Sequence, residues 1–245
     1  TQSITQQLAN PTRFMALSDK LLPWLWGVAA AILAIGLWMT FFRAPPDYQQ
    51  GETVKIMFIH VPSAWLAMGG YILTAISSFG LLVFRHPLAD VSAKAAAPIG
   101  AVFTALALLT GMLWGKPMWG AWWVWDARLT SELILLFLYL GFMFLHAAID
   151  DPRRADRAAA VIAIVGAINV PIIYFSVKWW NTLHQGASVS LTKSPTMAST
   201  MLWGMLIMSI AFWLYAIAAV LTRVRSVILE RERNADWVRQ LGEGA

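Results

Sequence analysis

Long apolar runs alternate with short polar segments along this chain. A helix needs about 20 mostly apolar residues to cross the hydrocarbon core of a bilayer. Six runs meet this requirement, at residues 21–42, 57–84, 95–114, 130–149, 157–177 and 201–222. In the second run we expect the helix proper to begin near Pro62, and in the fifth we expect Asn169 and Pro171 to give a polar contact and a kink. The pattern predicts six transmembrane helices.

Composition supports a membrane protein and excludes a soluble one. Hydrophobic residues make up 59% of the 245 residues and charged residues only 13%, whereas about 25% of the residues in soluble domains are charged. The mean hydropathy is +0.62. The chain has no cysteine, which excludes disulfides, zinc–thiolate sites and covalent c-type haem attachment within it. We therefore expect an all-α integral membrane bundle.

The distribution of basic residues predicts the orientation of this bundle. Six spans place both termini on one side of the membrane, and 12 of the 18 Lys and Arg residues lie on that side. The other six are Arg43, Lys55, Lys116, Arg128, Lys178 and Lys193. Because basic residues concentrate in cytoplasmic segments, both termini are predicted to be cytoplasmic. Residues 1–222 would form the membrane domain, and residues 223–245 a polar cytoplasmic tail.

Unusual residues gather on the face opposite the termini. Of the four histidines, His60 and His184 are predicted to reach this outer face, and His86 and His146 the cytoplasmic face. The segment WGKPMWGAWWVWD, residues 114–126, lies between His60 and His184 in the sequence. It contains five of the fourteen tryptophans: Trp114, Trp119, Trp122, Trp123 and Trp125. Its glycines and proline indicate a shaped loop rather than a continuing helix.

These residues allow more than one interpretation. Tryptophans anchor proteins at the membrane interface, and a single histidine there usually has a structural role. However, five tryptophans in twelve residues exceed what anchoring requires, and a broad apolar surface suits a flat apolar ligand. Neutral imidazole binds metals, and two imidazoles can occupy both axial positions of haem iron. They would also suit copper or zinc, but neither metal needs an aromatic platform.

Four charged residues predicted at the outer face are further candidates. Asp126 is as well explained by an N-cap of the fourth span as by a functional role. Arg128 lies one turn before Glu132 and could pair with it, or could bind a ligand carboxylate in a bidentate manner. Lys55 and Lys116 are weaker candidates for the carboxylate role.

Three segments together resemble one family. They are HVPSAW at 60–65, APIGAVFTALALLTGMLWGKPMWGAWWVWDARLTSELILLFLYLG at 97–141, and KWWNTLHQG at 178–186. The chain is similar to the heme exporter protein C family (CcmC) of system I cytochrome c biogenesis, within the WWD superfamily of haem-handling proteins. The resemblance covers about three quarters of the chain.

The resemblance implies a function and a set of partners. Members of this family hold haem b at the periplasmic face of the bacterial inner membrane, between two axial histidines that correspond to His60 and His184. The WWD loop, here Trp114, Trp119, Trp122, Trp123, Trp125 and Asp126, would form the haem platform. Arg128 and Lys55 would contact the propionates. The partners would be the ABC transporter subunits CcmA and CcmB, the small protein CcmD and the haem chaperone CcmE, which binds the haem covalently.

Two other functions compete with haem delivery. One is a bis-histidine membrane cytochrome for electron transfer, although such proteins usually place their ligands inside the bundle. The other is a transporter that moves haem through its own bundle, which would need polar residues at mid-membrane depth. The spans offer little of that kind beyond Asn169. We expect a haem-binding and delivery protein rather than an enzyme, with a lyase-like part in forming the haem–CcmE adduct as the one enzymatic role that the resemblance would allow.

Overall fold

The computed structural model describes residues 10–186, 188–189 and 194–243. Lys193, one of the six basic residues predicted on the outer side, lies outside these ranges. The first nine residues of the predicted membrane domain and the last two of the predicted tail also lie outside them. Within these ranges eight α-helices follow one another, and short π-helical and 3-10 segments extend two of them. The α-helices are α2 (Pro11–Trp38), α3 (Met57–Phe79), α4 (Pro87–Trp119), α5 (Ala127–Ala148), α6 (Pro152–Gly166), α7 (Asn169–Trp179), α8 (Ser199–Arg231) and α9 (Asp236–Glu243). The other segments are η1 (Met39–Arg43), η2 (Glu52–Ile56) and η3 (Gly80–Phe84).

The prediction of six membrane-crossing helices is confirmed. Among the described residues, six helical stretches are long and apolar enough to cross a membrane: Pro11–Arg43, Glu52–Phe84, Leu88–Trp119, Ala127–Ala148, Pro152–Trp179 and Ser199–Arg231. Each is longer than the corresponding apolar run, because further residues at its ends continue the helix. In α8, for example, the helix passes Thr222 without a break, and Val224 and Ile228 pack against Val91 and Ala95 of α4.

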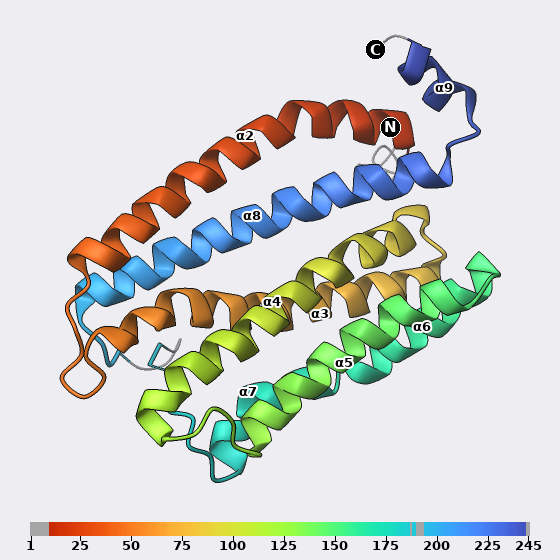
Figure 1. Ribbon diagram of the computed structural model, residues 1–245. Coiled ribbons are helices and arrows are strands. Elements are labelled where there is room, and N and C mark those ends of the chain that lie inside the picture. Colours follow the sequence, from red (N-terminus) through yellow and green to blue (C-terminus); the bar gives the residue numbers. More distant parts are fainter. Residues whose placement is uncertain (1–9, 187, 190–193, 244–245) are drawn as a thin grey trace.

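The helices form a bundle in which α2 lies along α8, α3 along α4, and α5 along the broken pair α6 and α7 (Figure 1). The core between α3, α4 and α5 is built on two fully buried tyrosines. The Tyr71 and Tyr139 rings meet edge to face with centroids 5.0 Å apart, and the Tyr139 hydroxyl donates to the Ala67 carbonyl at 2.7 Å. Gly100 is required here, because a Cβ at this position would overlap the Tyr139 ring.

The fifth span breaks where the sequence predicted a kink. Residues 167 and 168 form a turn between α6 and α7, since Pro171 has no N–H to donate to the carbonyl four residues earlier. The Asn169 side chain donates to the Ser131 carbonyl of α5 at 2.8 Å. This contact is the predicted polar one, and it ties α7 to α5.

Two local predictions were wrong. Helix α3 begins at Met57 rather than near Pro62, and η2 precedes it, so Pro62 lies buried within the second turn. Pro62 has no N–H to donate, so one hydrogen bond is missing in this turn while the helix continues. Helix α4 also continues through Gly115 and Pro117 as far as Trp119. The turn begins at Gly120, whose φ of 75° lies in the left-handed region that favours glycine.

The first described turn of α2 and helix α9 lie at the same end of the bundle (Figure 1). The connections between α4 and α5 and between α7 and α8 lie at the opposite end. The tryptophan-rich segment and His184 therefore share one end of the molecule, as the even number of spans predicted.

Candidate functional site

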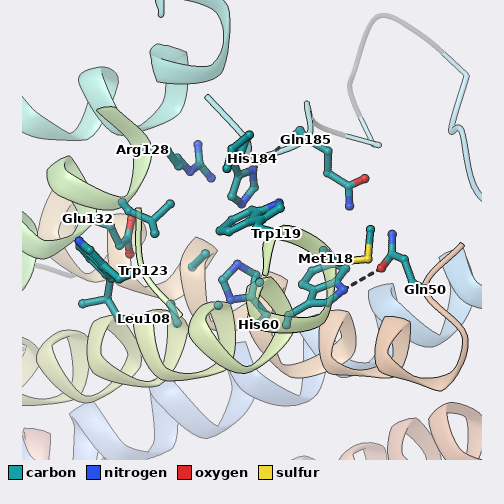
Figure 2. Close-up of a pocket in the computed structure, with 17 residues that line it drawn as sticks. Gln50, His60, Leu108, Met118, Trp119, Trp123, Arg128, Glu132, His184 and Gln185 are labelled. Carbon is teal, nitrogen blue, oxygen red and sulfur yellow. Dashed lines mark hydrogen bonds between the residues drawn. The ribbon is translucent and has the colours of Figure 1, made fainter. Parts of the chain in front are cut away.

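A cavity of about 250 Å³ opens at the end of the bundle that carries the tryptophan-rich segment. Helices α3, α4 and α5 form its walls, together with the segments that follow η1 and α7 (Figure 2). Its lining is mainly apolar and aromatic, with a few polar groups, as is typical of ligand sites. The polar and aromatic lining residues are Gln50, His60, Trp114, Trp119, Trp123, Arg128, Glu132, His184 and Gln185.

His60 and His184 meet across this cavity. His60 lies on the first turns of α3 and His184 in the segment after α7, yet their ring centroids are only 6.2 Å apart, with 36° between the ring planes. The Nδ1 atom of His60 lies 3.1 Å from the Thr110 hydroxyl, and Nδ1 of His184 lies 2.8 Å from the Gln185 carbonyl oxygen. Each ring thus uses Nδ1 in a hydrogen bond, which leaves Nε2 as the nitrogen that can bind a ligand.

The spacing of the two rings fits a shared metal. Metal–imidazole bonds are about 2 Å long, so two imidazoles on opposite sides of one metal ion would have centroids roughly 6 Å apart. Burial, and secondarily the positive charge of Arg128, lower the pKa of His184 below its ordinary value. His184 is therefore neutral at pH 7, which is the form that coordinates metals.

The other two histidines lie at the opposite end and have other partners. Nδ1 of His86 accepts from the Leu88 N–H and caps α4. His146 lies against Asp156 of α6, with 3.3 Å between Nε2 and the carboxylate. The structure therefore separates the four histidines into the two pairs that the topology predicted.

The five tryptophans of the 114–126 segment divide into two groups. Trp114, Trp119 and Trp123 line the cavity. The Trp114 ring meets His60 edge to face at 5.7 Å, and its Nε1 donates to the Gln50 side chain at 2.7 Å. In contrast, Trp122 and Trp125 are 50% and 77% exposed and are not part of the lining. Sequence reasoning treated all five as one platform, because a linear motif does not show which side chains face inward.

Asp126 has two structural roles. One carboxylate oxygen accepts from the Leu129 N–H at 2.8 Å and caps α5, as one of the two interpretations predicted. The other accepts from the Thr182 hydroxyl. The Thr182 oxygen in turn accepts from the His184 N–H at 3.0 Å. Asp126 therefore connects the start of α5 to the segment that carries His184, although it does not line the cavity itself.

The basic candidates Arg128 and Lys55 differ in whether they line the cavity. Arg128 lines the cavity beside His184 (Figure 2) and donates from one guanidinium nitrogen to the Ile173 carbonyl at 2.7 Å. Within the described residues it forms no ion pair with Glu132 at 4 Å or less, so the other donors of its guanidinium remain for a ligand. Lys55 lies outside the lining, where it pairs with Glu52 at 2.7 Å and donates to the Phe41 carbonyl at 3.3 Å.

Two buried polar atoms of the lining have no hydrogen-bond partner among the described residues. They are Oε1 of Glu132 and Nε1 of Trp123. Such orphans are rare in native structures and often mark a place where a ligand or water completes the site. Glu132 is only 7% exposed and lies within a membrane span. An acidic residue in such a span was a usable sequence signal, but the sequence suggested only pairing with Arg128.

Sequence reasoning missed several residues of the site. Thr110, Thr182 and Gln50 contact site residues through hydroxyl or amide groups. Threonine and glutamine are common in helices and loops, so no local pattern distinguishes these three. They become recognisable only once the fold brings α3, α4 and the segment after α7 together.

Comparison with known proteins identifies the family of this chain. A family model described as heme exporter protein C matches residues 4–239. Heme exporter protein C of Bradyrhizobium diazoefficiens is 60% identical over 224 residues, which cover 91% of this chain and 85% of that protein. The proteins of the same name from Escherichia coli K12 and Haemophilus influenzae are 46% and 42% identical, and each alignment covers 96% of this chain and at least 95% of the relative. This multi-pass membrane chain therefore belongs to the heme exporter protein C family.

Proposed function

We propose that this protein binds haem b between His60 and His184 and delivers it to the haem chaperone CcmE. Binding would take place at the periplasmic face of the bacterial inner membrane, with both termini in the cytoplasm. CcmA and CcmB would form the associated ABC transporter, with CcmD in the same complex. The protein itself would bind and present haem rather than catalyse a reaction.

One observation carries the proposal: two histidines from distant parts of the chain face one another across an aromatic cavity, at the separation that a shared metal requires. Copper or zinc would use the same two nitrogens, but these metals usually take further nitrogen, oxygen or sulfur ligands. The aromatic lining instead matches the flat faces of a porphyrin, and the name of the relatives, heme exporter protein C, supports haem as the ligand.

The polar groups of the cavity suit the rest of the haem molecule. Arg128 would bind a propionate with the guanidinium donors that are not used by Ile173. Lys55 is not part of this proposal, because Glu52 and the Phe41 carbonyl already engage its ammonium group. Trp114, Trp119 and Trp123 would pack against the ring.

The open side of the cavity is consistent with presentation of haem. The cavity opens at the end of the bundle rather than being enclosed within it. A haem held by both histidines would therefore keep one edge outside the protein. That edge would be available to the chaperone, while Trp122 and Trp125 would lie exposed beside it.

The two rival functions have less support. A transporter needs polar groups along a path through the bundle, but the Asn169 side chain ties α7 to α5. The buried Glu132 lies in the second turn of α5, in the lining of the cavity itself. An electron carrier usually buries both axial ligands deep in the bundle. Here His184 lies outside the spans in a connecting segment, at the end of the molecule where the cavity opens.

The test is a visible absorption spectrum of the purified protein with haem, before and after CcmE is added. Delivery predicts a six-coordinate bis-histidine spectrum, which decreases as CcmE acquires covalent haem. A bis-histidine spectrum that remains with this protein while electrons exchange would instead identify an electron carrier. Reporter fusions after Gln185 and after Arg231 test the orientation, with periplasmic and cytoplasmic signals expected respectively.

A further inference from the structure

Thr110 of α4 lies directly behind His60. Its hydroxyl oxygen is 3.1 Å from Nδ1 of His60, and the residue is only 8% exposed. The same hydroxyl donates to the Leu106 carbonyl one turn earlier, at 2.7 Å, and lies 3.2 Å from the Ala107 carbonyl. Thr110 thus makes the usual back-bond of a threonine within a helix and also contacts a ligand candidate on the neighbouring helix.

The available protons and the distances favour one direction for these hydrogen bonds. A hydroxyl has one proton and can accept at its lone pairs, whereas a carbonyl oxygen can only accept. The Thr110 oxygen lies closer to the Leu106 carbonyl, at 2.7 Å, than to Nδ1 of His60, at 3.1 Å, so we assign its proton to the carbonyl and its lone pair to His60. In this arrangement Nδ1 of His60 carries the imidazole proton. Because a neutral imidazole has one N–H, the lone pair is on Nε2.

Gly111 makes this contact possible. A Cβ at this position would lie 3.0 Å from Cε1 of His60, closer than such contacts normally come. With glycine here, the imidazole packs against the backbone of α4 and Nδ1 comes within reach of the Thr110 hydroxyl. The adjacent pair Thr110 and Gly111 therefore sets both the hydrogen bond and the position of the ring.

The second histidine obtains the same tautomer in a different way. Nδ1 of His184 donates to the carbonyl of its own neighbour, Gln185, at 2.8 Å. This bond uses backbone next to the histidine and follows the local conformation of the chain. His60, in contrast, depends on a side chain 50 residues away in sequence. A substitution can therefore remove the support of one ligand and leave the support of the other.

We propose that Thr110 is the positioning residue for His60: it holds the ring as the Nδ1–H tautomer and so keeps Nε2 ready to bind the iron of incoming haem. This inference rests on the proposed function for its ligand, although the tautomer itself is a property of the haem-free protein. Hydrogen-bonding partners of metal-bound histidines typically contribute 10- to 100-fold to metal affinity. Loss of the Thr110 hydroxyl should have an effect of that size.

Three variants test the proposal. Thr110→Val keeps the shape of the side chain but removes the acceptor, while Thr110→Ser keeps the hydroxyl. Thr104→Val is the matched control, because Thr104 is also buried on α4 and donates to the carbonyl four residues earlier, at 2.7 Å. The substitution Thr104→Val therefore removes the same kind of side-chain to backbone hydrogen bond, at a site nearly two turns of α4 away from Thr110.

The first measurement is a titration of each purified variant with ferric haem, followed by its bis-histidine absorption bands. We expect Thr110→Val to bind 10- to 100-fold more weakly than wild type, and Thr110→Ser and Thr104→Val to bind nearly as wild type does. Equal affinities for Thr110→Val and Thr104→Val would overturn the proposal. An equal loss in Thr110→Val and Thr110→Ser would also overturn it, because the effect would then follow packing rather than the hydroxyl.

The second measurement needs no haem. In protein with ¹⁵N-labelled histidine, nitrogen chemical shifts distinguish Nδ1–H from Nε2–H imidazole, and His60→Gln identifies the signal. We expect His60 to be the Nδ1–H tautomer in wild type and Thr110→Ser, and to lose this preference in Thr110→Val. An Nε2–H tautomer in wild type would overturn the inference. Failure of wild type to give a bis-histidine spectrum would instead contradict the proposed function.

Discussion

The two ends of the bundle each place a histidine beside charged residues, but they use them differently. At the end that carries the termini, Lys94 of α4 bonds Asp90 at 3.1 Å and Asp156 of α6 at 2.7 Å. His146 of α5 approaches the same Asp156 carboxylate at 3.3 Å. At the other end, His60 and His184 face a cavity, and Arg128 retains free donors.

The difference lies in whether the charges are already neutralised. Ligand atoms of Asp90, His146 and Asp156 lie within 4.8 Å of one another, a spacing at which a metal ion could bind. However, the Lys94 ammonium already occupies the position of the cation and bonds both carboxylates. This ionic cluster therefore holds α4, α5 and α6 together. In the cavity, by contrast, no hydrogen bond among the described residues uses Nε2 of His60 or His184, and under the proposed function these atoms and Arg128 would bind haem.

The comparison shows that a histidine near an acidic or basic residue does not identify a ligand site. What distinguishes the two ends is the state of the second ring nitrogen and the space in front of it. Nδ1 of His146 lies 3.0 Å from the Phe142 carbonyl, and its Nε2 faces a carboxylate. For His60 and His184, Nδ1 is used and Nε2 is left for the cavity. Four predictions test this contrast, in order of decreasing effect.

The largest effect is expected from the removal of an axial ligand. His60→Gly or His184→Gly should abolish the bis-histidine spectrum of bound haem, because six-coordination requires both imidazoles. Added imidazole should restore the spectrum in part by entering the space left by the side chain. His146→Gln is the control and should bind haem like wild type. If the His146 variant lost the bis-histidine spectrum and the His60 and His184 variants kept it, the haem site would lie at the end of the bundle that carries the termini.

The second effect is a loss of stability at the ionic cluster. Lys94→Met would leave the Asp90 and Asp156 carboxylates without their shared cation. Removal of one partner from a buried ion pair destabilises a protein by about 3–5 kcal/mol, and less where the side chains are partly exposed, as Lys94 is. We expect a lower unfolding temperature in detergent and unchanged haem affinity once the protein is folded. A loss of haem affinity at wild-type stability would show that this end also contributes to the ligand site.

The third effect separates the two groups of tryptophans. Trp119→Ala should weaken haem binding by about two- to tenfold, since an aromatic contact contributes about 0.5–1.5 kcal/mol beyond area burial. Trp125→Ala is the matched control from the same segment, because Trp125 is exposed and outside the cavity, and its haem affinity should be unchanged. The amount of covalently loaded CcmE per bound haem should be measured for both. Equal haem affinities would show that the cavity lining does not form the platform.

The smallest effect is expected at Asp126. Asn caps helices about as well as Asp, so Asp126→Asn should leave α5 stable. One amide oxygen cannot readily replace both carboxylate oxygens, so the bond from Thr182 should weaken. Loss of one hydrogen bond contributes about 1 kcal/mol, which corresponds to a roughly fivefold lower haem affinity through the displacement of His184. Thr182→Val should match it, and wild-type affinity in both variants would leave Asp126 with the capping role alone.

Much of the site could be found from the sequence because lipid imposes strong rules on it. The positions of His60 and His184 on one face followed from the number of spans, and the N-cap role of Asp126 followed from its place before an apolar run. The sequence did not show that Trp122 and Trp125 face outward or that Lys55 is engaged elsewhere. These outcomes depend on the path of the chain between helices, which hydropathy does not describe.

The sequence by itself determined the six helices, their order and the end of the molecule to which each histidine belongs. It did so because a backbone in lipid must satisfy its own hydrogen bonds, and only long apolar helices do this segment by segment. Tertiary structure decided which side chains meet. Thr110 reaches His60 because Gly111 leaves room for the imidazole ring beside α4, and Thr182 reaches Asp126 because the segment after α7 returns over the start of α5. Such contacts join residues about 50 positions apart, and their geometry arises only when the helices pack.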